Sequence, residues 1–116
     1  MPPSREPTYF ERRLQRVAAL SEEQELVVYR VAQEALTNVA RHARASNVEL
    51  SLEQDQGEVT LRVRDDGRGL APEALKSATG IRGMRERAML IGAQLSIIGP
   101  EAVGTELVLR VPLDER

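Results

Sequence analysis

The chain has 116 residues, which is enough for one domain with one hydrophobic core and too few for two. Its net charge of −2 argues against nucleic acid as the main partner, because phosphate contacts need a clear excess of basic residues. The sequence has no cysteine and one histidine, which excludes disulfides, thiol nucleophiles, thiolate metal sites and any site that needs two histidines.

The beginning of the chain has no clear pattern. Residues 1–7 contain three prolines and predict a flexible leader, so we expect the domain to span residues 8–116. Residues 8–20 fit either a helix or an edge strand. The helical stripe would consist of Phe10, Leu14, Val17 and Ala18, and the strand face of Phe10, Arg12 and Leu14.

A long helix is predicted next. Ser21 and Gln24 have the spacing of a capping box, in which each side chain binds the other residue's backbone N–H. Apolar residues then recur at helical spacing, which predicts a helix from about Glu22 to Ala43. The predicted stripe comprises Val28, Ala32, Ala35, Leu36, Val39 and Ala43.

Strands are predicted in pairs, with helices between the pairs. Residues 47–53 and 59–63 alternate apolar and polar side chains around a turn at Asp55-Gln56-Gly57, as in a hairpin with one apolar face. Residues 94–98 and 105–111 form a second pair. This order indicates an α+β two-layer sandwich, with a mixed or antiparallel sheet and helices on one face.

The second helix is predicted from Met84 to Ile91. Gly80 and Gly83 precede it, and Gly92 can end it as the C′ residue. Backbone N–H groups at a helix N-terminus bind anions, so the two glycines could form a phosphate site. A flexible loop before a helix would explain them equally well.

A polar ridge runs along the first helix. Glu34, Asn38 and His42 are four residues apart, so each is displaced by only about 40° around the helix axis. A carboxylate and an amide beside each other can hold a hard cation such as Mg²⁺ or position a water. The alternative is an ordinary solvated helix flank.

The end of the second predicted strand carries a more specific pattern. Asp65-Asp66-Gly67-Arg68-Gly69 places a carboxylate at the strand end, followed by glycines that let a flat ligand approach closely. Such a carboxylate could accept a hydrogen bond from the exocyclic amine of adenine. A plain Asp-Gly turn is the alternative, and a tight turn also explains Gly104-Thr105. The sequence contains no Walker-type phosphate loop.

In this order the segments resemble a known family. Residues 33–43, Gln-Glu-Ala-Leu-Thr-Asn-Val-Ala-Arg-His-Ala, resemble the N box of sensor histidine kinases of the nitrate-sensor type. Residues 65–69 resemble their G1 box, residues 80–88 their G2 box and Gly104-Thr105 their final glycine–threonine element. The likeness covers about Leu20 to Pro112, and it favours an edge strand for residues 9–14.

The resemblance implies a fold and a set of roles. The fold is the Bergerat-type sandwich shared with gyrase B subunits, heat-shock chaperones and mismatch-repair ATPases. Asn38 would coordinate Mg²⁺ on the ATP phosphates, with Glu34 as a candidate base or partner of a metal-bound water. The other implied nucleotide-binding residues are Arg41 and His42 at the phosphates, Asp65, Gly67, Gly69 and Thr105 at the adenine, and Gly80 and Gly83 around a lid of residues 70–79.

The sequence departs from the family pattern at Asp66, where asparagine is usual. The dimerisation helix with its acceptor histidine is also missing, since His42 is the chain's single histidine and belongs to the N box. The resemblance therefore implies the catalytic domain of a longer kinase, with a LuxR-like response regulator downstream. We expect this chain to be monomeric and cytoplasmic, which is compatible with a membrane-anchored parent.

Two other functions remain open at this point. An anti-sigma-type serine kinase shares the fold but transfers phosphate to a protein serine, and its boxes resemble these segments less well. A degenerate ATP-binding module would retain the nucleotide without the transfer.

Overall fold

Two helices and five strands make up the part of the chain that the computed structural model describes, which is residues 9–14, 20–38, 47–55, 57–67, 79–98 and 104–113. The strands are β1 (Tyr9–Leu14), β2 (Asn47–Asp55), β3 (Glu58–Asp65), β4 (Gln94–Ile98) and β5 (Thr105–Pro112). The helices are α1 (Glu22–Asn38) and α3 (Thr79–Leu90).

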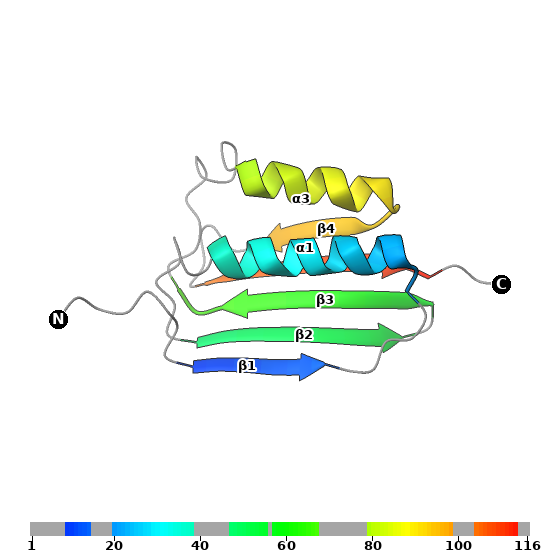
Figure 1. The fold of residues 1–116 in the computed structure, drawn as a ribbon. Helices are drawn as coiled ribbons and strands as arrows, with labels where there is room; N and C mark the ends of the chain where they lie inside the picture. Colours follow the sequence, from blue (N-terminus) through cyan, green and yellow to red (C-terminus); the bar gives the residue numbers. More distant parts are fainter. Residues whose placement is uncertain are drawn as a thin grey trace.

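All five strands form one sheet in the order β1-β2-β3-β5-β4 (Figure 1). β1 is parallel to β2, and the other neighbouring pairs are antiparallel. Residues 9–14, within the segment that sequence patterns left open between helix and strand, are therefore an edge strand of the sheet. A mixed, mostly antiparallel sheet is confirmed.

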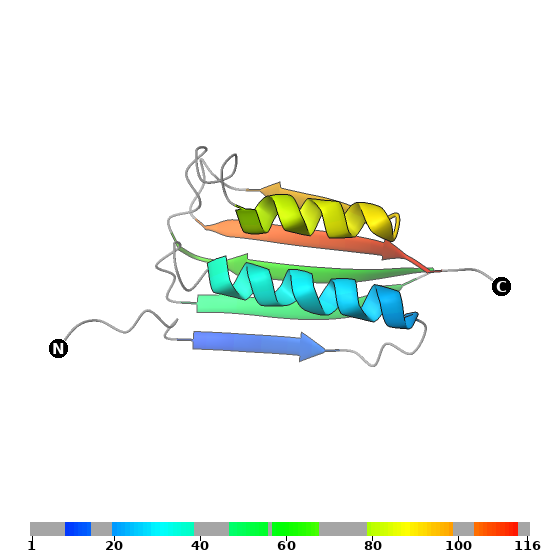
Figure 2. The same ribbon diagram turned by 45° about the horizontal axis from the view of Figure 1, so that its top comes forward.

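Both helices lie on the same face of the sheet, as Figures 1 and 2 show from two directions. This confirms the predicted two-layer α+β sandwich. The sheet buries the apolar side of its alternating strands against the helices and leaves the polar side uncovered by them. In β3, for example, Val59, Leu61 and Val63 are buried in the core.

The start of α1 is fixed by the capping box that the sequence predicts. The backbone N–H of Gln24 donates to Ser21 Oγ at 3.1 Å, and the N–H of Ser21 donates to Gln24 Oε1 at 2.9 Å. Gln24 Nε2 also donates to the carbonyl oxygen of Pro112 at 3.0 Å. The cap therefore ties the helix to the end of β5 as well as closing its first turn.

The buried face of α1 is broader than predicted. Its buried residues are Gln24, Val27, Val28, Val31 and Ala35, with Ala32 and Leu36 partly buried. The burial of Val27 and Val31 was not predicted. A helix that lies flat on a sheet buries a broad surface, and the predicted apolar stripe covered only one edge of it. The predicted continuation of the helix to Ala43 lies outside the described residues.

The predicted start of the second helix was wrong. α3 begins at Thr79, five residues before the predicted start at Met84. A glycine costs a helix only about 1 kcal/mol, and here Ile81, Met84 and Ala88 bury one continuous face against the core. This packing outweighs the low helix propensity of the glycines.

The end of α3 agrees with the prediction. Gly92 has a φ of 65°, its N–H donates to the Met89 carbonyl at 3.2 Å, and the N–H of Ala93 donates to the Ala88 carbonyl at 2.9 Å. These two bonds form a Schellman motif with Gly92 as C′.

The capping box gives a first prediction. Ser21→Ala should lower the free energy of unfolding by about 1 kcal/mol, because the N–H of Gln24 loses its acceptor. Urea denaturation measures the change. Gln33→Ala, at an exposed position of the same helix, should change stability by less than about 0.5 kcal/mol. Equal effects of the two substitutions would show that the cap contributes nothing.

Candidate functional site

The sequence-predicted residues that the structure describes gather at one end of the sandwich. α1 ends there at Asn38, β3 ends at Asp65, β5 begins at Thr105 and α3 begins at Thr79. In Figures 1 and 2 this is the left-hand end of the molecule. β3 and β5 run in opposite directions, and so do α1 and α3. The end of β3 therefore lies beside the start of β5, and the end of α1 lies at the same end of the molecule as the start of α3.

Asp65 is the polar member of an otherwise apolar strand face. It follows Val59, Leu61 and Val63 at the same two-residue spacing, and only 7% of its surface is exposed. Its Oδ1 accepts a hydrogen bond of 2.8 Å from the backbone N–H of Gly67, which closes an Asx turn. The carboxylate is thus fixed on the helix-covered side of the sheet.

Burial raises the pKa of Asp65 above its ordinary value, because the charged form loses water contacts. The negative charge of Asp66 raises it further. Hydrogen bonds from the backbone N–H groups of Gly67 and Thr105 act in the opposite direction. The site therefore keeps a carboxylate where burial disfavours its charge, which is common at functional positions.

Thr105 lies directly opposite Asp65 in the β3–β5 register. Its Oγ1 is buried and has no hydrogen-bond partner among the described residues. A buried hydroxyl without a partner costs about 1–3 kcal/mol. A carboxylate and an unpartnered hydroxyl side by side are suited to a ligand that both donates and accepts hydrogen bonds.

Gly104 is required by this arrangement, although sequence patterns suggested only a turn. Its φ is 92°, and a Cβ there would lie 2.1 Å from the carbonyl oxygen of Asp65. No larger residue fits without moving backbone. Glycine followed by threonine at a strand start was the available signal, but the close approach to Asp65 is a tertiary contact.

Glu34 and Asn38 lie one turn apart near the end of α1, and both are half-buried. Their oxygens suit a hard cation. The described residues contain no ready cluster of three or more carboxylates or histidines that could hold a metal by themselves. A cation at this position would need oxygens from elsewhere, such as the phosphates of a ligand.

The glycines were predicted to precede the second helix, and this position was wrong, because both lie within α3. Gly80 is the second residue of α3, so its N–H belongs to the first turn, whose N–H groups have no partner within the helix. Gly83 is the fifth residue, and its N–H falls within the regular hydrogen-bond ladder. A Cβ at Gly83 would meet Arg87 Nη1 at 3.0 Å, but Arg87 is exposed and its flexible side chain can move aside.

The remaining predicted site residues cannot be located. Arg41, His42 and Gly69 lie outside the described residues, as does the predicted lid apart from Thr79, which begins α3.

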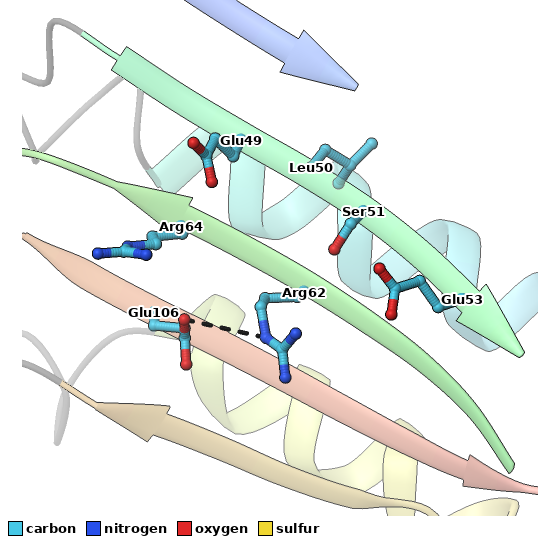
Figure 3. Close-up of a pocket in the computed structure, with 7 residues that line it drawn as sticks. All are labelled: Glu49, Leu50, Ser51, Glu53, Arg62, Arg64 and Glu106. Carbon is cyan, nitrogen blue, oxygen red and sulfur yellow. Dashed lines mark ion pairs between the residues drawn. The ribbon is translucent and has the colours of Figure 1, made fainter. Parts of the chain in front are cut away.

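A hollow of about 420 Å³ lies on the other face of the sheet, away from Asp65 (Figure 3). Its lining consists of Glu49, Leu50, Ser51, Glu53, Arg62, Arg64 and Glu106. Arg62 Nε lies 3.9 Å from Glu106 Oε2, so part of the charge is neutralised within the sheet. The glutamates would repel a polyphosphate, and this hollow is not the candidate site.

Comparison with known proteins decides the family. The family model of histidine kinase-, DNA gyrase B-, and HSP90-like ATPases matches residues 23–115. The chain belongs to this ATPase family. No helix among the described residues is long and apolar enough to span a membrane.

Two curated relatives of this chain are histidine kinases. The chain is 36% identical over 96 residues to the sensor histidine kinase LiaS of Bacillus subtilis, covering 82% of this chain and 27% of LiaS. It is 43% identical over 79 residues to the histidine-protein kinase/phosphatase UhpB of Salmonella typhimurium, covering 68% of this chain and 16% of UhpB. The chain thus spans about a quarter or less of either relative.

A solved structure supports the same assignment. The histidine kinase domain of a blue-light activated kinase from Erythrobacter litoralis superposes with a TM-score of 0.79 and 27% identity, over 90% of this chain and 51% of that one. Membership of the ATPase family implies ATP as the ligand. Adenine carries both an amino donor and ring-nitrogen acceptors, which fits the carboxylate of Asp65 beside the unpartnered hydroxyl of Thr105.

The close approach at Gly104 gives a second prediction. Gly104→Ala should lower the free energy of unfolding by about 2–4 kcal/mol, from backbone strain plus the overlap with Asp65. Gly92→Ala is the matched control, because its φ is also positive but a Cβ there meets nothing within 4 Å. We expect about 1 kcal/mol for Gly92→Ala by urea denaturation. Equal losses at both positions would contradict the steric argument.

The buried carboxylate gives a third prediction. Because the folded state raises the pKa of Asp65, the stability that its proton confers is full below the ordinary pKa and is lost as pH rises through the raised one. Asp65→Asn has no such proton to lose, so its unfolding free energy should rise relative to the wild type across that window. Urea denaturation at a series of pH values measures the difference.

The same variant should bind ATP about 1–3 kcal/mol more weakly, through loss of a charged hydrogen-bond acceptor. Calorimetric titration with an ATP analogue tests this on folded protein. An unchanged dissociation constant would remove Asp65 from the nucleotide site.

Proposed function

We propose that this domain binds Mg-ATP and donates the γ-phosphate to a histidine on a separate dimerisation domain, as part of two-component signalling. The observation that carries the proposal is the buried carboxylate of Asp65 beside the unpartnered hydroxyl of Thr105, at the same end of the sandwich as Asn38. Both curated relatives named above are histidine kinases, which supports a histidine as the acceptor of the phosphate.

The adenine end of the site would be formed by β3 and β5. Asp65 would accept a hydrogen bond from the adenine amino group, and Thr105 would bind the same end of the base. Gly67 and Gly69 would leave room for the ring to enter beside the strand end. The adenine would thereby satisfy a hydroxyl that is otherwise buried without a partner among the described residues.

The phosphate end would be formed by the two helices. Asn38 would hold Mg²⁺ through its side-chain oxygen, with Arg41 and His42 approaching the phosphates and the N–H of Gly80 donating at the start of α3. Residues 70–79 would cover the nucleotide as a lid.

The transfer itself would need little covalent chemistry from this domain. The bond between the γ-phosphorus and the bridging oxygen breaks, a phosphorus–nitrogen bond forms with the acceptor imidazole, and ADP leaves. Glu34 would accept the imidazole proton directly or through a water. The acceptor comes from the dimerisation domain, and a LuxR-like response regulator would take the phosphate next, in the cytoplasm.

Calorimetric titration with a non-hydrolysable ATP analogue, with and without Mg²⁺, tests the nucleotide site. Asn38→Ala should weaken binding in the presence of Mg²⁺ by about 1–3 kcal/mol and change it little without the cation. Gln33→Ala, on the exposed face of the same helix, should bind like the wild type. Absence of binding in every condition would contradict the proposal.

The acceptor can be tested separately. When the chain is mixed with ATP and a dimerisation domain from a related sensor kinase, the transferred phosphate should be labile to acid, as phosphohistidine is. An acid-stable product would indicate a hydroxyl acceptor and favour the serine-kinase alternative.

A further inference from the structure

The end of the β2–β3 hairpin beside Asp65 is held by an exchange of hydrogen bonds between Asn47 and Asp66. The backbone N–H of Asn47 donates to Asp66 Oδ1 at 2.8 Å, and Asn47 Nδ2 donates to Asp66 Oδ2. In return, the backbone N–H of Asp66 donates to the carbonyl oxygen of Asn47 at 3.2 Å. We call these three bonds the Asn47–Asp66 clamp.

The clamp adds one residue pair to the β2–β3 ladder, and in this pair a side-chain oxygen replaces a backbone carbonyl as hydrogen-bond acceptor. β2 and β3 are antiparallel, with Val48 opposite Asp65, so Asn47 and Asp66 would be the next pair. In a regular hydrogen-bonded pair each residue's N–H donates to the other's carbonyl. Here the carboxylate of Asp66 accepts from Asn47 in place of the Asp66 carbonyl, and the chain can turn away at Gly67 without breaking the pairing.

The position of Asp65 is therefore fixed by hydrogen bonds of its own side chain and of the residue that follows it. Its own carboxylate binds the N–H of Gly67, and the next residue is fixed to the first residue of β2. Asparagine, which is usual at position 66 in the family that the sequence resembles, offers only one side-chain oxygen. It could not accept from both nitrogens of Asn47 with separate oxygens, as Asp66 does.

We propose that the Asn47–Asp66 clamp positions Asp65 to recognise the amino group of adenine, and so sets the preference of this site for adenine over guanine nucleotides. The inference rests on the proposed nucleotide site. At the position of the adenine amino donor, guanine carries an oxygen acceptor, which a carboxylate repels. Discrimination between them needs the carboxylate within hydrogen-bonding distance, and a shift of 1 Å weakens such a contact strongly.

The test is the pair of dissociation constants for ATP and GTP, measured by calorimetry on the whole chain. In Asn47→Ala and Asp66→Ala the dissociation constant for ATP should rise about tenfold while that for GTP changes little, so the ratio of the GTP constant to the ATP constant falls about tenfold. Asp66→Asn should give an intermediate ratio, because it keeps one acceptor. The double variant Asn47→Ala/Asp66→Ala should lose no more than Asp66→Ala alone, since Asp66→Ala already removes the acceptors of both bonds from Asn47 to the carboxylate.

Asp55→Ala is the matched control, an exposed carboxylate at the far end of the same hairpin, and its ratio should equal that of the wild type. A ratio that stays constant in Asn47→Ala and Asp66→Asn would overturn the clamp, and so would parallel losses for ATP and GTP, which indicate general loosening. Asn47→Ala and Asp66→Asn keep the test valid if Asp66→Ala fails to fold. Absence of ATP binding by the wild type would instead refute the nucleotide site itself.

Discussion

The site depends on one constraint, which is a carboxylate at the end of a strand face that is otherwise apolar. Asp65 occupies the position where the alternation of Val59, Leu61 and Val63 would place another core side chain. Its charge is disfavoured by burial and tolerated because backbone N–H groups of Gly67 and Thr105 donate to it. Those donors exist only because the chain turns at Gly67 and because Gly104 lets β5 begin close to β3.

The antiparallel arrangement turns this local feature into a site. The end of β3 meets the start of β5, and the end of α1 meets the start of α3, all at the same end of the sandwich (Figure 1). Polar groups from distant positions in the chain, such as Asn38 and Asp65, are thereby brought to one end of the sandwich. The interior between the helices and the sheet remains aliphatic, which keeps the two layers packed while the ligand-binding groups lie at the rim.

The two faces of the sheet differ in what they can bind. On the outer face, charges are compensated across neighbouring strands, as in the pairs Arg62–Glu106 and Arg110–Glu58. Exposed pairs of this kind contribute little to stability, but they leave no concentrated charge for a polyphosphate. Among the residues that the structure describes, Asp65 is the one buried carboxylate on the helix-covered face, and its less polar environment strengthens the hydrogen bonds that it makes.

Local signals in the sequence determined the pieces of this domain. The Ser21–Gln24 capping box, the C′ role of Gly92 and the two-residue alternation of the strands each involve residues within a few positions of one another, so sequence spacing is enough to predict them. The family resemblance also predicted Asp65 and Thr105 as members of one site, and the structure places them opposite each other. Their roles toward a ligand stay predictions.

Tertiary structure decided what sequence spacing could not. The burial of Val27 and Val31 depends on how α1 lies on the sheet, and the early start of α3 depends on the packing of Ile81 against the core. The steric need for glycine at position 104 and the hydrogen bonds between Asn47 and Asp66 join residues far apart in the chain. Such contacts are set by strand register and by the approach of separate backbones, so they exist only once the whole sheet has assembled.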